Sequence, residues 1–247
     1  MKKLIYLMVV IAVLGLIVSG CSIPLKSVVP TSEKGNPKPE LGTPTLEKIT
    51  FIHYVKPTTN SKPVWDDTVD IYKFMFGGIK WAATMQYEVN TAGSDLDDND
   101  VMAALSASLE TWDTETSFEL FDDELGVTKR KFNSGDRINR VTWGGLPWEN
   151  AIAMCVFWFN PATKEIVESD VVFSTNFDWS VDGVSGTMDL QNIATHEFGH
   201  NGLNDLYMPP STALTMYGYG DYGETKKRDL GIGDILGIQE LYGPPLP

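Results

Sequence analysis

The sequence predicts an α+β fold, in which helices pack against a twisted sheet. Three observations support this prediction. Short β-rich segments come first, one amphipathic helix pattern interrupts them, and two further helix patterns lie toward the end of the chain. Strands do not alternate regularly with helices and no internal repeat is present, so one domain with segregated elements is expected.

The strand segments are rich in β-branched and aromatic residues or show a period of two. Residues 49–55, ITFIHYV, end at a loop of Pro, Thr, Asn and Ser. Apolar side chains alternate in residues 80–90, which predicts a half-buried strand. Four more short strands are expected at 117–121, 138–143, 151–159 and 167–175.

The first helix is expected after SDLDDND, because acidic residues stabilise a helix N-terminus. Apolar residues follow at helical spacing: Val101, Leu105, Leu109 and Trp112. An EF-hand loop is the alternative interpretation of these acids, but counted from Asp95 its sixth position is Asp100 and its twelfth is Ser106, which do not fit. A second helix should begin near Thr187 or Asp189 and include residues 190–200, and a third should cover 233–243.

The N-terminus has the pattern of an export signal. Two lysines precede an apolar run from Leu4 to Val18, and small residues lead to Cys21. The segment VSGC resembles a lipobox, so residues 1–20 are predicted to be a lipoprotein signal peptide and Cys21 the lipidated residue. An uncleaved N-terminal anchor is the alternative. Either way the chain is exported, to the outer face of a membrane or in secreted form.

Residues 21–46 are rich in Pro, Ser, Thr and Lys and are predicted to be a flexible tether, which leaves 47–247 as the folded domain. Without the two signal lysines the chain has 17 basic and 33 acidic residues, a net charge near −16. This charge argues against nucleic acid as a partner. Cys155 lies in an apolar run and is expected to be a core thiol, and with Cys21 lipidated no intrachain disulfide is possible.

The segment HEFGHNGLNDLY, residues 196–207, has a pattern typical of a metal site. His196 and His200 lie one helical turn apart on the same face, so both can bind one ion. Glu197 is rotated off this row and is free to hold a water molecule.

A zinc site normally needs a third protein ligand, and Asp205 is the preferred candidate. Gly202 is expected to take a positive φ, to end the helix and to turn the chain back toward the metal. Asn204 is a poorer ligand, and His53 would have to come from another part of the fold. If Asp205 is not the ligand, Asp221 or Glu224 are the next candidates.

Around these residues the sequence resembles the metzincin metallopeptidases, and within them the matrixins. The family pattern is HExxHxxGxxH, with aspartate in the last place in a snapalysin-like branch; this chain has HExxHxGxxD, one residue shorter before the glycine. Met216, in LTMYGYG, is similar to the Met-turn methionine of metzincins. Residues 228–243, RDLGIGDILGIQELYG, are similar to the C-terminal helix of matrixins.

The resemblance implies a zincin domain, with a mostly parallel sheet, an antiparallel edge strand and about three helices. It also implies one catalytic Zn²⁺ held by His196, His200 and Asp205. The implied reaction is hydrolysis of peptide bonds in a protein or peptide substrate, by a zinc-bound water that Glu197 activates.

The substrate is expected to lie along an edge strand, for which residues 153–159 are the candidate, and the resemblance implies a wall of the site at Tyr217, Gly218 and Tyr219. No PRCGVPD-like inhibitory segment is present. Residues 47–79 match nothing in the family, so they form a candidate inhibitory lid with Asp66 or Asp67 at the open position of the metal.

Three histidines are too few for a second, structural zinc site. Structural calcium is a further expectation, with oxygen ligands among Asp170, Asp178 and Asp182, although no ligand spacing singles it out. Two other functions stay open. One is a catalytically silent lipoprotein that binds a protein or envelope component, and the other is a thermolysin-like hydrolase with Glu224 or Glu240 as ligand. The sequence does not indicate the oligomeric state.

Overall fold

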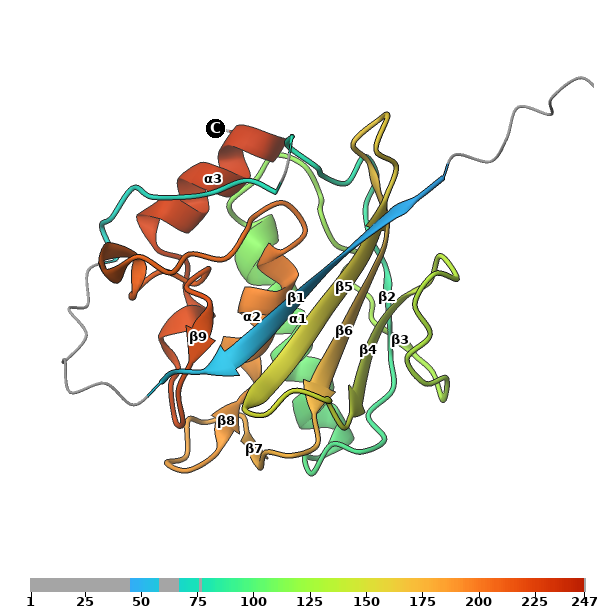
Figure 1. Cartoon of the computed structure of the whole chain (residues 1–247), viewed down its shortest axis with the longest axis vertical. Helices are drawn as coiled ribbons and strands as arrows, with labels where there is room; N and C mark the ends of the chain where they lie inside the picture. Colours follow the sequence, from blue (N-terminus) through green and yellow to red (C-terminus); the bar gives the residue numbers. More distant parts are fainter. Residues whose placement is uncertain (1–44, 58–66, 76, 247) are drawn as a thin grey trace, which may run out of the picture. The chain divides into compact units, whose positions relative to one another are not determined.

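The computed structural model describes residues 45–57, 67–75 and 77–246 (Figure 1). Three α-helices are present in this part of the chain: α1 (Asp98–Asp113), α2 (Leu190–Gly199) and α3 (Ile232–Tyr242). The export signal, Cys21 and the tether up to residue 44 lie outside the described residues. Among the residues that are described, no helix has both the length and the apolar character that crossing a bilayer requires.

The main sheet has seven strands in the order β3-β2-β4-β6-β5-β1-β9. Neighbouring strands are parallel except at β5, which is antiparallel to both β6 and β1. The predicted α+β class, with a mostly parallel sheet and three helices, is confirmed. The strands of this sheet are β1 (Glu47–Val55), β2 (Tyr87–Val89), β3 (Gly126–Val127), β4 (Asn139–Gly144), β5 (Ala151–Phe159), β6 (Ile166–Ser174) and β9 (Tyr219–Gly220). A separate small sheet pairs β7 (Trp179–Ser180) with β8 (Met188–Asp189).

The outer side of β5 is covered by β1. The two strands pair from Glu47 opposite Phe159 to Tyr54 opposite Ala151, with a register shift after His53. Strand β1 also pairs in parallel with β9, where Tyr54 faces Tyr219. Residues 151–159 therefore do not present the free edge expected for a substrate, because β6 and β1 occupy both sides of this strand.

The prediction of a strand over residues 80–90 is wrong for most of that segment. Only β2 joins the sheet, while Lys80 and Met85 make isolated bridges with Glu165 and Phe121. The backbone N–H of Trp81 donates to the hydroxyl of Tyr242 rather than to a neighbouring strand. Residues 117–121 likewise contribute only the bridge at Phe121, because hydrogen bonds in this region go to side chains such as Asp113.

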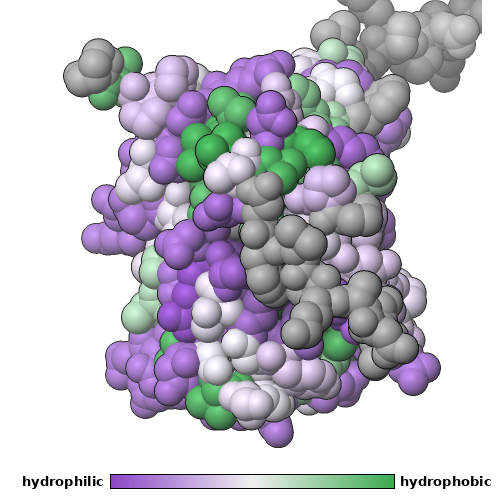
Figure 2. Space-filling model, turned by 90° about the vertical axis from the view of Figure 1, so that its left-hand side faces the viewer, coloured by the Kyte–Doolittle hydropathy of each residue, from purple (hydrophilic) through white to green (hydrophobic). Residues whose placement is uncertain are grey.

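The core lies between the sheet and the first two helices. The helical spacing predicted for α1 is confirmed, since Val101, Leu105, Leu109 and Trp112 are all buried. Its N-cap is Asp97, whose carboxylate accepts from the N–H of Asn99, so the acidic residues cap a helix and do not form an EF-hand loop. Figure 2 shows the face on the side of β9 and α3, which is largely hydrophilic with apolar side chains gathered near its upper end.

Candidate metal centre

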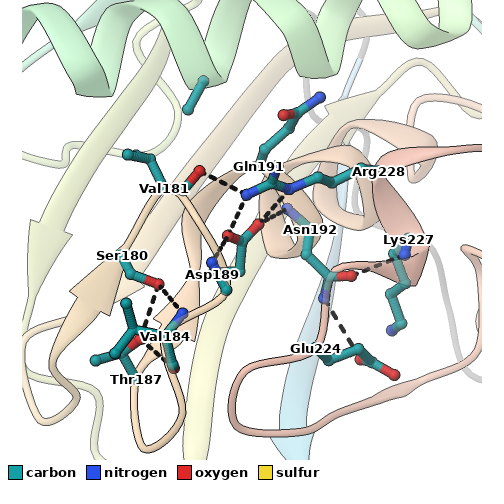
Figure 3. Close-up of polar contacts among 12 residues, drawn as sticks. Ser180, Val181, Val184, Thr187, Asp189, Gln191, Asn192, Glu224, Lys227 and Arg228 are labelled. Carbon is teal, nitrogen blue, oxygen red and sulfur yellow. Dashed lines mark hydrogen bonds and ion pairs between the residues drawn. The ribbon is translucent and has the colours of Figure 1, made fainter.

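The start of α2 is fixed by a buried carboxylate. Asp189 is the N-cap residue, and its side chain accepts from the N–H of Asn192 at 2.9 Å. The guanidinium of Arg228 is directed at the same carboxylate, and the Asn192 side chain links α2 to the backbone of Lys227 and the side chain of Glu224 (Figure 3). This network holds the helix that carries both histidines at a defined orientation.

Three of the predicted site residues meet in one place. The Nε2 of His196 lies 3.2 Å and the Nε2 of His200 3.6 Å from Oδ1 of Asp205. All three side chains are buried, and one ligand atom from each lies within 4.8 Å of the others. Such a cluster has the size and the chemistry of a zinc site with two imidazoles and one carboxylate.

Backbone carbonyls orient both imidazoles. The Nδ1 of His196 lies 2.7 Å from the carbonyl oxygen of Thr215, and the Nδ1 of His200 lies 3.1 Å from that of Leu203. A carbonyl only accepts, so each Nδ1 carries the proton and each Nε2 presents a lone pair to the centre of the cluster. Histidine ligands of metals are commonly held in this way.

The interior of the cluster fits a cation. Among the described residues, His196 Nε2, Asp205 Oδ1 and Glu197 Oε2 are buried without a hydrogen-bond partner. With its proton on Nδ1, His196 faces the carboxylate of Asp205 with one lone pair opposite another. Since buried acceptors that face each other are costly unless a donor or a cation lies between them, these side chains are arranged to hold a positive ion.

The protonation states support the same conclusion. Burial, together with the charge of Lys227, lowers the pKa of His196 to about 3, and burial lowers the pKa of His200 too, so both imidazoles are neutral at pH 7. Burial alone would raise the pKa of Asp205, but the pKa is held below its ordinary value, and the hydroxyl of Tyr207 donates to this carboxylate. The cluster therefore offers two neutral nitrogens and one anionic oxygen.

A comparison with known protein families matches residues 80–243 to the matrixin family. The chain belongs to the matrixin family. It is 30% identical over 179 residues to the hatching enzyme of Paracentrotus lividus, 29% over 180 residues to metalloendoproteinase 1-MMP of Arabidopsis thaliana, and 25% over 181 residues to human stromelysin-3. These alignments cover 70%, 70% and 71% of this chain but only 28%, 47% and 34% of those proteins, so the chain spans less than half the length of each.

The turn after the second histidine is built differently in this matrixin from what we expected. Helix α2 ends at Gly199, and Gly202 does not have a positive φ. The prediction that Gly202 reverses the chain through a left-handed conformation is wrong. A Cβ at this position would lie 2.6 Å from Cδ1 of Leu241, so the glycine is needed for close packing against α3.

The segment with Met216 lies against the end of α2. A Cβ on Gly199 would be 2.3 Å from the Met216 sulfur, so the methionine packs directly under the last turn of the helix. The carboxylate of Asp234, near the start of α3, accepts from the N–H groups of Thr215 and Met216 at 2.7 and 3.1 Å. The similarity noted for residues 228–243 thus has a structural role in this matrixin, because Asp234 holds the turn whose carbonyl orients His196.

The wall residues expected from the family lie beside the cluster. Tyr217 and Tyr219 have ring centroids 5.7 Å apart, and Gly218 lies between them, where a Cβ would meet the ring of Tyr207 at 2.5 Å. Tyr207 was not predicted to belong to the site. Its hydroxyl donates to Oδ2 of Asp205 at 3.0 Å, which leaves Oδ1 directed at the histidines.

Two further residues belong to the site: His53, which the sequence offered only as a less favoured metal ligand, and Lys227, which it did not mark. His53, in β1, is buried, and its Nδ1 lies 3.0 Å from Oε1 of Glu197. Lys227 is fully buried, with Nζ 3.0 Å from Nε2 of His53 and in contact with the carbonyl oxygen of Tyr217. Burial lowers the pKa of Lys227 to about 8 and raises the pKa of Glu197 well above its ordinary value. Among three histidines His53 was a visible candidate, but no pattern marks Lys227.

Several alternative candidates do not come to the cluster. Glu240 accepts from the hydroxyl of Tyr72 on the exposed side of α3, and Glu224 contacts Asn192 and Lys226. Asp67 is exposed and belongs to neither of the described metal-binding groups, so it does not occupy the open position of the metal as the lid prediction had it, while Asp66 lies outside the described residues. The remaining candidates named from the sequence also stay out of the described metal-binding groups: Asp170, Asp178, Asp182, Asn204 and Asp221.

Proposed function

We propose that this matrixin is a zinc-dependent endopeptidase, with His196, His200 and Asp205 as the metal ligands and Glu197 as the general base. One observation carries the proposal: buried acceptor atoms of His196 and Asp205 face each other without a donor between them. The family match and the names of the relatives, among them a hatching enzyme and an interstitial collagenase, point to the same class of reaction.

A zinc ion held by these residues would polarise the scissile carbonyl and make a nearby water more acidic. Glu197 is placed to act on that water, because its Oε2 is buried, has no partner among the described residues and belongs to the helix that carries both histidines. Burial raises the pKa of Glu197, which makes its carboxylate a stronger base for the incoming proton. Glu197 would then deliver this proton to the nitrogen of the leaving amine.

Substrates are expected to be extended peptides that take the place of β1 beside β5, with Tyr217 and Tyr219 near the side chain that follows the scissile bond. Export and a lipid anchor at Cys21 rest on the sequence alone and complete the proposal, which places the domain outside the cell or on the outer face of a membrane. A structural calcium remains a proposal without a defined ligand set.

Glu197→Gln tests the general base. The amide keeps the size of the side chain but cannot take a proton, so we expect hydrolysis of casein by the zinc-loaded chain to fall about 100-fold or more, with unchanged zinc content. Glu240→Gln, on the exposed side of α3, is the matched control. Equal rates for Glu197→Gln and the control would remove Glu197 from the mechanism.

Asp205→Ala tests the third ligand. Loss of the only anionic ligand should weaken zinc binding by roughly 100-fold or more, measured by competition with a chromogenic chelator. Asp221→Ala, at an exposed acid outside the cluster, should bind zinc as the unmodified chain does. Unchanged zinc affinity in Asp205→Ala would show that the third ligand lies elsewhere. A chain that binds zinc yet has no chelator-sensitive activity in any form would instead favour the silent binding protein.

A further inference from the structure

Strand β1 lies where the proposed substrate would have to bind. Both features expected to hold a substrate strand, residues 153–159 and the wall at Tyr219, are paired with β1 in the structure. It runs antiparallel to β5 and parallel to β9, and its last hydrogen bonds go from Val55 to the carbonyl of Asn150 and from Lys56 to that of Gly220. Since β6 occupies the other side of β5, an incoming peptide can pair with this strand only if β1 leaves.

The side chains of β1 alternate between the two faces of the sheet. Phe51 and Val55 pack on the helical side, and His53 lies on that side with them, while Ile52 and Tyr54 pack on the opposite face. The ring of Phe51 stacks on His200 with centroids 3.8 Å apart and planes within 4°. Strand β1 therefore covers one proposed metal ligand directly with an aromatic side chain.

His53 reaches the other half of the site. Its ring centroid is 3.9 Å from that of His196, and its Nδ1 meets Glu197 at 3.0 Å. The ammonium of Lys227 lies 3.0 Å from Nε2 of His53, and with its proton on Nδ1 the imidazole accepts from Lys227 and donates to the carboxylate of Glu197. The proposed general base is thereby occupied by a donor from the chain itself.

The space around His53 is shaped for this ring. A Cβ on Gly220 would lie 3.0 Å from side-chain carbons of Ile152 and Ile193 and 3.3 Å from Nε2 of His53, so the absence of a side chain at Gly220 makes room for the imidazole. His53 is the only fully buried residue of β1. The anchoring contact of the strand is therefore made inside the site and not on the surface of the sheet.

We propose that β1 is an internal, substrate-like ligand that keeps the site closed, with His53 as its anchor on Glu197 and Lys227. This proposal rests on the endopeptidase function proposed above. The region matched to the matrixin family begins at residue 80, so β1 is additional to the part of the chain that carries the metal site. The site becomes accessible to a peptide when β1 leaves the groove between β5 and β9.

The test uses the full chain loaded with zinc and two variants that loosen β1 in different ways. His53→Ala removes the anchor, and Val55→Pro removes the N–H that donates to Asn150 while His53 stays intact. Thr50→Ala, an exposed residue of the same strand whose side chain points away from the site, is the matched control. Circular dichroism identifies variants that are folded, and either loosening variant is sufficient for the test.

Two measurements separate this proposal from the proposed function. The first is the anisotropy of a fluorescein-labelled peptide with the sequence of residues 47–56, EKITFIHYVK. We expect His53→Ala and Val55→Pro to bind it at least tenfold more tightly than the unmodified chain and Thr50→Ala. The second is casein hydrolysis, which should rise at least tenfold in the same two variants and fall when the unlabelled peptide is added.

Each outcome has a defined meaning. Tighter peptide binding without hydrolysis in any form supports the internal ligand and contradicts the endopeptidase. Chelator-sensitive hydrolysis at the same rate in all forms, with equal peptide affinity, overturns the internal ligand and leaves the endopeptidase intact. A folded Val55→Pro chain with unchanged affinity and unchanged rate would also overturn the proposal.

Discussion

Gly199, inside the HEFGH segment, gives a sharp test of how the site is packed. It is the last residue of α2, and a Cβ there would lie 2.3 Å from the Met216 sulfur and 2.6 Å from Cζ2 of Trp112. Ordinary contacts between such atoms are about 3.5–4.0 Å, so each neighbour would have to move by about 1 Å. Trp112 is fully buried, and its Nε1 donates to the carbonyl of Thr195 at 2.8 Å, so it has little freedom to move.

Two effects of Gly199→Ala oppose each other. Alanine favours a helix over glycine by up to about 1 kcal/mol, and by less at the last residue. Overpacking a dense core costs about 1–3 kcal/mol. Because Met216 and Trp112 belong to different segments and both would have to move, we expect a cost near the upper end of this range. We therefore expect a net loss of about 2 kcal/mol, which for a domain of this size lowers Tm by about 4–8 °C.

The assay is thermal unfolding of the metal-free chain, followed by near-ultraviolet circular dichroism. Gly145→Ala is the matched control, because a Cβ at Gly145 has no atom within 4 Å and its φ lies outside the left-handed region. This control should stay within about 0.5 kcal/mol of the unmodified chain. A Gly199→Ala chain as stable as the control or more stable would refute the packing of Met216 and Trp112 under α2.

Two further predictions concern stability. Arg228→Met leaves the buried carboxylate of Asp189 without its cation and should lower the free energy of unfolding in urea by about 2 kcal/mol, whereas Arg130→Met, at an exposed arginine, should change it little; equal losses would contradict the role of the pair. Burial raises the pKa of Asp113 to about 7, so the folded chain holds a proton that the unfolded chain releases near pH 4, and this contribution to stability declines as pH rises from about 4 to 7. Asp113→Asn removes that decline. The free energy of unfolding of this variant minus that of the unmodified chain should therefore be larger at pH 8 than at pH 5, and a difference that does not change with pH would contradict the raised pKa.

The elements that the sequence predicted well are those set by neighbouring residues. The 3.6-residue spacing identified α1, and the continuous apolar run of residues 151–159 gave β5 with its observed bounds. His196, Glu197 and His200 could be placed relative to one another because one helical turn determines their geometry. In each case the information lies within about four residues of the chain.

The parts that were missed depend on contacts between distant segments. A period of two marks residues 49–55 as a strand but does not say which strand they pair with, and His53 meets Glu197 across 144 positions. Lys227 is 174 positions from His53, and only the fold shows that it is buried. Gly202 was misread for a related reason. A glycine can serve a positive φ or the close approach of another element, and Leu241, which decides the matter here, lies on α3.

The short segment after His200 positions several parts of the site at once. Its turn is regular, since the N–H of Leu203 bonds to the carbonyl of Gly199 at 2.9 Å. The carbonyl oxygen of Leu203 accepts from Nδ1 of His200, and the hydroxyl of Tyr207 donates to Oδ2 of Asp205. The same short segment therefore positions two of the three proposed ligands, and a longer turn would displace both Asp205 and the carbonyl that orients His200.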